Sequence, residues 1–441
     1  MRERIIQFGE GGFLRSFFDM FVHIMNAKGL FDGKVVVVQP IEKGLIDVIN
    51  QQHGVYHQYL RGIENGRVVN EVTAVESISR GVDPYKDYLG YLELAKNPDM
   101  RFIVSNTTEA GIEYLGTESL SDAPPKSFPA KLTALLYERF KLGLPGFIIL
   151  CCELIDRNAD LLREYVVRYA ELWELGREFI DWLENENRFV NTLVDRICTG
   201  YPKDEAKALL SELGCEDRLL NTAEIFHLWV IEGDYESELP LKQAGINVIW
   251  TDDVTPYKKR KVRILNGAHT SMVLAARLLG LSTVGECLEN EQVLGMLKRT
   301  LFEEIIPTLG SKEEDIAFGN AVLERFANPF VKHQLLSIAL NSVSKLRARV
   351  LPTILEYRDK YGSLPKCLTM SVAALIAFYR TDEANDSPEI MEFMKKATVG
   401  EILSRVDYWG CELSFMQEAV EKTLEIIKTG GMTGYYGEAL S

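Results

Sequence analysis

The sequence predicts an α/β protein, in which a doubly wound, Rossmann-like domain is followed by an all-helical domain. The chain opens with a strand, a glycine turn and a helix, and apolar runs then alternate with amphipathic segments up to about residue 254. After Pro256 the periodicity is helical only. Because 441 residues exceed the roughly 250 to 300 at which one hydrophobic core stops growing, two domains are expected, 1–256 and 257–441.

The first βαβ unit occupies the first 41 residues. RIIQF (4–8) is a short apolar run that ends at the turn GEGG (9–12), and large apolar side chains then recur at helical spacing from Phe13 to Met25. VVVVQPI (35–41) is rich in β-branched residues and closes with a proline, as is typical of a buried parallel strand.

A hairpin is expected next, because Glu64-Asn65-Gly66 separates two apolar runs and Asn-Gly is the strongest short hairpin signal. Strand and helix then continue to alternate. Strands are expected at 101–108, 146–154 and 246–254, and helices at 130–140, 160–185 and 203–213.

The second half shows a period of 3.6 residues throughout. The terminal segment GGMTGYYGEALS, rich in glycine, is expected to fray. Helical segments are expected at 260–279, 289–306, 312–326, 331–359, 368–380 and 414–429.

Composition limits the partners and the compartment. A net charge of −15 repels nucleic acid and anionic membranes, and no run approaches the ~18 apolar residues of a membrane span. The first residues lead into a strand, not into a signal peptide. The seven cysteines are scattered without metal-type spacing, so we expect packing thiols in a reducing compartment, the cytoplasm.

The glycine turn resembles the dinucleotide fingerprint G-x-G-x-x-G, with Leu14 at the third glycine position. A strand before it and a helix after it favour nucleotide binding over a merely structural turn. Arg15 is either a phosphate ligand or a surface arginine. The acid expected after the second strand comes late, at Glu42, which leaves the cofactor assignment leaning to NAD.

KVRILNGAHT (261–270) places a cation, an amide and an imidazole within nine residues. On an α-helix, His269 would lie about 60° from Asn266 and about 80° from Lys261, so the three would share one broad face. Hydride transfer to or from a secondary alcohol needs a proton acceptor and donors that steady the alkoxide. Burial and the cations at 258–260 would lower the pKa of the Lys261 amine toward that role.

Taken singly, each residue has an ordinary explanation: a surface lysine, an asparagine bonded to backbone, a core histidine. Their combination at the expected domain boundary, where clefts usually form, favours a catalytic site.

These residues and several longer motifs carry a resemblance to the polyol-specific long-chain dehydrogenase/reductase family. Its hallmark is Lys, four residues, Asn, two residues, His, which is matched here by Lys261, Asn266 and His269. The likeness covers nearly the whole chain. It includes QFGEGGFLRSF, SNTTEAGI (105–112), CELIDRNA (152–159), FVNTLVDRI (189–197) and RFANPFVKHQLLSIAL (325–340).

The resemblance implies a metal-independent, NAD-dependent hydride transfer. Lys261 would be the general acid/base, Asn191 and Asn266 would hold the reacting oxygen, and His269 would orient the substrate. From its motif alone, Asn191 would be a turn or cap residue. The cofactor residues implied are Phe8, Gly9, Gly11, Gly12, Phe13, Arg15, Asn106, Thr107 and Glu109.

Two departures place the chain within the family. The polyol enzymes read G-F-H-R-x-H after the glycines, whereas this chain reads GFLRSF, and Ser337 stands where an arginine often precedes Lys345 by eight residues. Both changes resemble the tagaturonate reductase branch, which interconverts a ketouronate and an aldonate. Such a substrate needs a cationic contact for its carboxylate, and Lys345 and His333, on a helix expected to begin at 331, are the candidates.

Three alternatives remain. Fructuronate reductases and polyol dehydrogenases belong to the same family and differ in substrate. A catalytically silent nucleotide sensor would need the glycine turn but not the Lys261, Asn266 and His269 set.

Overall fold

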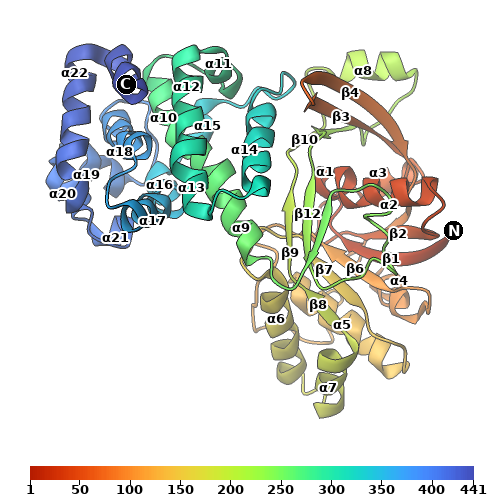
Figure 1. Cartoon of the computed structure of the whole chain (residues 1–441). Coiled ribbons are helices and arrows are strands. Elements are labelled where there is room, and N and C mark those ends of the chain that lie inside the picture. Colours follow the sequence, from red (N-terminus) through yellow and green to blue (C-terminus); the bar gives the residue numbers. More distant parts are fainter. The chain divides into compact units, whose positions relative to one another are not determined.

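The computed structural model describes residues 1–441 (Figure 1). The chain forms two compact units, Met1–Val254 and Thr255–Ser441. None of its helices combines the length and the apolar character needed to cross a membrane.

A six-stranded parallel sheet forms the centre of the N-terminal unit. The chain starts in the middle, moves outward to one edge and then returns to the other side of the first strand. The carboxyl ends of β1 and β6 therefore flank the point where the strand order reverses, which is where doubly wound sheets bind ligands. The order is β5 (Ile78–Val82), β2 (Gly33–Val38), β1 (Arg2–Phe8), β6 (Phe102–Ser105), β7 (Ile148–Cys151) and β8 (Arg188–Val190).

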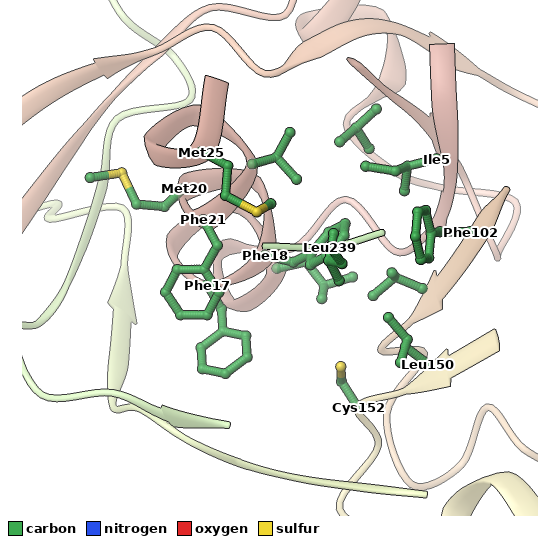
Figure 2. Close-up of a cluster of buried hydrophobic side chains, with 14 of the residues drawn as sticks. Ile5, Phe17, Phe18, Met20, Phe21, Met25, Phe102, Leu150, Cys152 and Leu239 are labelled. Carbon is green, nitrogen blue, oxygen red and sulfur yellow. The ribbon is translucent and has the colours of Figure 1, made fainter. Parts of the chain in front are cut away.

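Alternate residues of these strands face two separate cores, as the pleat requires. Ile5 and Val37 belong to one core, whereas Ile6 and Val38 belong to the other. Figure 2 shows the first core, where aromatic side chains of α2, such as Phe18, meet the sheet. This face is covered by α1 (Gly12–Ser16), α2 (Phe18–Ala27) and α3 (Ile46–Gln51), and the other by α4 (Tyr88–Leu92), η1 (Glu93–Lys96), α5 (Phe128–Lys141), α6 (Asn158–Leu172) and α7 (Arg177–Glu186). The doubly wound prediction is confirmed.

Two smaller sheets complete this unit. The predicted hairpin is confirmed, since β3 and β4 pair in antiparallel fashion around Asn65 and Gly66, whose φ angles are 52° and 74°. The strand expected at 246–254 does not extend the parallel sheet, because it pairs with a neighbouring short strand instead. The four-stranded sheet has the order β10 (Cys198–Gly200), β11 (Asn221–Glu224), β3 (Tyr56–Glu64) and β4 (Arg67–Val75). The three-stranded sheet has the order β13 (Val248–Thr251), β12 (Leu228–Glu232) and β9 (Thr192–Asp195). The helix α8 spans Ala206–Leu213.

The C-terminal unit contains helices and no strand. Its centre is α18 (Lys366–Tyr379), which is buried along almost its whole length. The helices around it are α9 (Thr255–Lys261), η2 (Val262–Gly267), α10 (Ala268–Leu278), α11 (Val284–Glu289), α12 (Glu291–Arg299), η3 (Thr300–Ile305), α13 (Ile306–Leu309), α14 (Glu313–Phe326), α15 (Leu335–Ile338), α16 (Ser342–Arg349), α17 (Leu351–Tyr361), α19 (Pro388–Lys396), α20 (Val399–Leu403), α21 (Val406–Trp409), η4 (Ser414–Met416) and α22 (Gln417–Leu440).

The expectation of a single helix over residues 331–359 is wrong. Residues 331–334 are not helical, and Gln334 instead forms a β-bridge with Thr283. Asn341 then adopts a left-handed conformation (φ 53°, ψ 46°) that ends one helix before the next begins. A further break precedes Pro352, which fits the first turn of a helix because it has no backbone N–H to donate.

The expectation that the C-terminal segment frays is also wrong. Residues 417–440 form α22, with a break at Gly431 (φ 61°). Beyond this break, Tyr435, Tyr436 and Ala439 are at most 1% exposed. Burial of two tyrosine rings outweighs the low helix propensity of the glycines around them.

Candidate functional site

The glycine turn connects the carboxyl end of β1 to α1, and two of its glycines are required by close contacts. Gly9 has a φ of +120°, and a Cβ there would stand 2.8 Å from the backbone oxygen of Asn106. A Cβ on Gly12 would stand 2.8 Å from Oδ1 of Asn221. Both glycines therefore let the turn pack closely against neighbouring strands.

Gly11 differs, because a Cβ at this position would meet no protein atom within 4 Å. The protein itself gives no steric reason for a glycine here. A backbone that leaves this space open suits a ligand that approaches the turn closely, as a pyrophosphate does in dinucleotide-binding folds.

The aromatic residues on either side of the turn are parts of the packing. Phe8 is fully buried, and its ring lies 4.8 Å from that of Phe128. Phe13 stacks on Phe17 with ring centroids 5.0 Å apart. We infer that both residues position the turn through their rings.

Arg15 is a buried arginine, only 4% exposed. Its Nε donates to the backbone oxygen of Glu10 at 3.2 Å, and Nη1 donates to that of Leu219. Its guanidinium also lies over the ring of Tyr56. These contacts tie the glycine turn to the neighbouring sheet, a structural role that neither the phosphate-ligand nor the surface interpretation had described.

The carboxyl end of β6 brings Asn106 and Thr107 next to the turn. Asn106 donates from Nδ2 to the oxygen of Cys152 at 2.7 Å, so its side chain joins the ends of β6 and β7. Thr107 donates from its backbone N–H and its hydroxyl to Glu153, at 2.9 and 3.1 Å. Glu109, further along, is exposed.

Glu153 was missed as a site residue, although it lies in the motif CELIDRNA. It is 2% exposed, and its other carboxylate oxygen accepts a hydrogen bond from the Ser105 hydroxyl at 3.0 Å. Burial raises the pKa of this carboxyl group, while the donated hydrogen bonds oppose the rise. Glu153 therefore holds the start of the loop after β6 in place, because it accepts hydrogen bonds from Ser105 and Thr107.

A pocket of about 330 Å³ opens beside the carboxyl ends of β2 and β6. Its volume lies within the range of ligand pockets in proteins. Glu42, the acid that comes late after the second strand, lines this pocket together with Tyr85, Thr107 and Lys126. The pocket therefore combines an aromatic ring with groups of both charges.

Asn191 lies between β8 and β9 and is 2% exposed. Its Oδ1 accepts hydrogen bonds from the backbone N–H groups of Ala159 and Asp160, at 3.0 and 3.2 Å. Its Nδ2 donates to Glu232 at 2.9 Å. The amide thus caps the first turn of α6, in agreement with the interpretation of its motif as a cap. One N–H of its Nδ2 group makes no hydrogen bond within the protein.

In the C-terminal unit, the KVRILNGAHT stretch is not a regular α-helix. Residues 262–267 form a π-helix, η2, between α9 and α10. A π-helix closes i→i+5 hydrogen bonds and is frequent at functional sites. Residues five apart, such as Lys261 and Asn266, therefore lie about one turn apart on nearly the same face, whereas an α-helix would separate them by about 140°.

Several of the cations near Lys261 form ion pairs with acidic side chains, which the sequence did not predict. Arg260 pairs with Asp315 at 2.7 Å, and Lys259 and Arg263 both pair with Glu356, at 3.1 and 3.0 Å. Acids from α14 and α17 thus offset this basic run.

Asn266 is partly buried, and its side chain makes no hydrogen bond within the protein. His269 stacks on Phe326 with ring centroids 4.2 Å apart, and its Nε2 is buried without a hydrogen-bond partner. Burial first, and then neighbouring basic groups, lower the pKa of His269 to about 3. An uncharged imidazole and a free amide therefore stand on neighbouring turns.

His333 and Lys345 both come close to His269, although they do not share a helix. The ring of His333 meets that of His269 edge-on at 5.1 Å. Lys345, in α16, donates from Nζ to the oxygen of Ile338 at 2.8 Å, and burial and Arg349 lower the pKa of its amine. Arg347, on the same helix, donates instead to the oxygen of Asp407.

Comparison with known families agrees with this geometry. Residues 3–243 match the model of the mannitol dehydrogenase Rossmann domain, and residues 253–428 match that of the mannitol dehydrogenase C-terminal domain. The chain belongs to the mannitol dehydrogenase family. The family resemblance seen in the sequence is thereby confirmed.

Within the mannitol dehydrogenase family, similar relatives bear the name altronate oxidoreductase. The protein from Yersinia enterocolitica is 42% identical over 97% of this chain and 94% of its own length. Those from Enterobacter sp. and Escherichia coli are each 47% identical over 88% of this chain and 82% of theirs.

Two solved structures share the fold at 22% sequence identity. One is a D-sorbitol dehydrogenase in substrate-free form, with a TM-score of 0.87 over 99% of this chain and 95% of that one. The other is the Pseudomonas fluorescens mannitol 2-dehydrogenase in a ternary complex with NAD and D-mannitol, with a TM-score of 0.74 over 100% of this chain and 94% of that one.

Proposed function

We propose that this protein is a tagaturonate reductase, which interconverts D-altronate and NAD with D-tagaturonate and NADH. The observation that carries the proposal is the identity of 42–47%, over most of the chain, to proteins named altronate oxidoreductase. The reaction removes a hydride from a secondary alcohol carbon and a proton from its hydroxyl. The C-terminal unit offers the amine, amide and imidazole that such chemistry uses.

The N-terminal unit fits a dinucleotide, which when bound would donate or accept the hydride. Gly9, Gly11 and Gly12 would hold the pyrophosphate, since the space at Gly11 is open. The pocket that contains Glu42 would take the adenosine end, where a carboxylate can accept hydrogen bonds from ribose hydroxyls. Asn106, Thr107 and Glu109 would lie near the nicotinamide ribose, and Phe8, Phe13 and Arg15 would support the turn.

We assign proton transfer to Lys261. As an amine it takes the hydroxyl proton during oxidation and returns a proton to the alkoxide during reduction. Asn266 would donate a hydrogen bond to the reacting oxygen, and the free N–H of Asn191 would be a second donor. His269 would orient the substrate from the next turn, and Lys345 and His333 would contact its far end. No step in this scheme requires a metal ion.

A reducing compartment such as the cytoplasm is the place of action that we infer, since all seven cysteines are free and four of them are at most 2% exposed.

Initial rates of NADH and NADPH oxidation with D-tagaturonate, D-fructuronate and D-fructose test the proposal. We expect D-tagaturonate with NADH to be the best pair. A preference for fructuronate or fructose would move the protein to another branch of the family, and tight NADH binding without turnover of any of the three would indicate a nucleotide sensor.

A further inference from the structure

The strongest unassigned feature is a group of basic side chains that faces His269. Arg325 of α14, His333, and Lys345 and Arg349 of α16 each add to the positive potential at this imidazole. They come from separate segments of the C-terminal unit. Since partly buried like charges repel one another, such a group favours the binding of an anion.

Arg349 differs from the other arginines of this unit. It is partly buried, burial lowers the pKa of its guanidinium, and it forms no hydrogen bond or ion pair with the rest of the protein. By contrast, Arg263 is paired with Glu356, and Arg277 with Glu383. A half-buried guanidinium without a partner keeps its donors available in the planar arrangement that matches a carboxylate.

Lys345 provides a second cation beside Arg349 on α16. Lys345 precedes Arg349 by one helical turn, so both side chains occupy the same face of α16. Burial first, and then the charge of Arg349, lower the pKa of Lys345, as expected of two cations one turn apart. Asp386 acts on Lys345 in the opposite sense but forms no ion pair with either side chain.

A close backbone contact holds Arg349 next to the motif that contains Asn266 and His269. A Cβ on Gly267 would stand 3.0 Å from the backbone oxygen of Arg349. The end of α16 therefore lies directly against the π-helix, and the buried, unpartnered Nε2 of His269 lies close to the same basic group.

We propose that Arg349 receives the carboxylate of the sugar acid, with Lys345 as the second cation. This inference rests on the proposed function, and it identifies the contact that would distinguish a uronate from an uncharged ketose. The ketone lies near Asn266 and His269, and the carboxylate, at the other end of the six-carbon chain, meets α16. Ion pairing with the bound substrate then relieves the repulsion within the basic group.

The test compares Arg349→Gln with the wild-type protein on two substrates that differ at one end. D-Tagaturonate carries a carboxylate where D-tagatose carries a primary alcohol. We expect Arg349→Gln to lower kcat/KM for D-tagaturonate by about 10²-fold, mainly through KM, because it removes one partner of a charge pair. The rate with D-tagatose should change by less than about threefold.

Arg347→Gln is the matched control, because Arg347 lies on the same helix but donates to the backbone of Asp407. It should leave the kinetics with both substrates unchanged. Arg349→Lys, which keeps the charge but loses the planar pair of donors, should fall between the wild type and Arg349→Gln. A thermal melt of each variant shows that the fold is intact.

The outcomes separate this inference from the proposed function. If the wild-type protein does not reduce D-tagaturonate, the proposed function fails. If it does, two results would show that the assignment of Arg349 is wrong while the proposed function stands. Either Arg349→Gln retains the wild-type KM for D-tagaturonate, or its kcat/KM falls as much with D-tagatose as with D-tagaturonate.

Discussion

Gly267 and Arg349 meet at a point where no side chain fits comfortably, since a Cβ on Gly267 would stand 3.0 Å from the backbone oxygen of Arg349. We predict that Gly267→Ala displaces the end of α16 by a few tenths of an ångström. The gain in helix propensity, about 1 kcal/mol, offsets part of the cost of overpacking. The free energy of unfolding should therefore change little, while kcat/KM falls about tenfold because the side chains at the end of α16 are misplaced.

Urea unfolding and initial rates, measured on the same preparation, check this prediction. Gly430→Ala provides the control, because a Cβ there meets no atom within 4 Å. Full activity in Gly267→Ala would show that the contact does not position the substrate.

Lys261→Ala should lower turnover by ~10² to 10⁴-fold, the usual effect of losing a general acid/base. NADH binding, followed by fluorescence titration, should stay near the wild-type value, because the glycine turn belongs to the other unit. Lys259→Ala, which removes only a surface pair with Glu356, should behave as the wild type does. Near-normal turnover in Lys261→Ala would remove this amine from the proton transfer.

Gly11→Ala should weaken NADH binding by about tenfold or more without destabilising the protein. No protein atom lies within 4 Å of the added Cβ, so any clash must come from a bound dinucleotide. Calorimetric titration with NADH and a thermal melt without ligand measure the two effects separately. If NADH binds to Gly11→Ala with wild-type affinity, the pyrophosphate does not approach this residue.

Asp19→Asn should change how stability depends on pH. Asp19 is fully buried, and burial raises its pKa from 3.8 to about 7, against the opposing effects of the hydrogen bond from Gln7 and the charge of Arg15. A folded-state pKa above the unfolded value stabilises the fold at low pH, and this contribution is lost as pH rises from about 4 to 7.

The asparagine variant lacks this dependence, and its Nδ2 offers a donor to Oε1 of Gln7, which has no partner. We therefore expect the unfolding free energy of Asp19→Asn, relative to the wild type, to rise by up to a few kcal/mol between pH 5 and pH 8. Urea titrations at both pH values measure it. Asp382→Asn, at a fully exposed aspartate, should show no such change.

The sequence predicted those features that depend on local pattern. β-Branched runs and the glycine turn predicted the first parallel strands, and Asn65-Gly66 predicted the hairpin. The lysine, asparagine and histidine of the 261–270 motif were found from spacing and family resemblance, and their catalytic roles remain predictions.

Other features depend on tertiary contacts that periodicity does not report. A period of 3.6 residues cannot reveal a π-helix, so the relation of Lys261 to Asn266 was wrongly taken as α-helical. The helix expected from residue 331 ignored the left-handed conformation of Asn341. Arg349 was not selected, because only coordinates show which of many arginines lacks an acidic partner.

The π-helix also makes the length of this segment a functional quantity. Because residues 261 and 266 lie about one turn apart here, shortening 262–265 by one would restore an α-helical turn and keep the amine at 261 on the same face as Asn266. Inserting one residue would instead rotate that amine around the axis by about 100° relative to the residues that follow. A one-residue insertion would thus turn the amine at 261 away from Asn266, whereas a one-residue deletion should leave the relation of these two side chains intact.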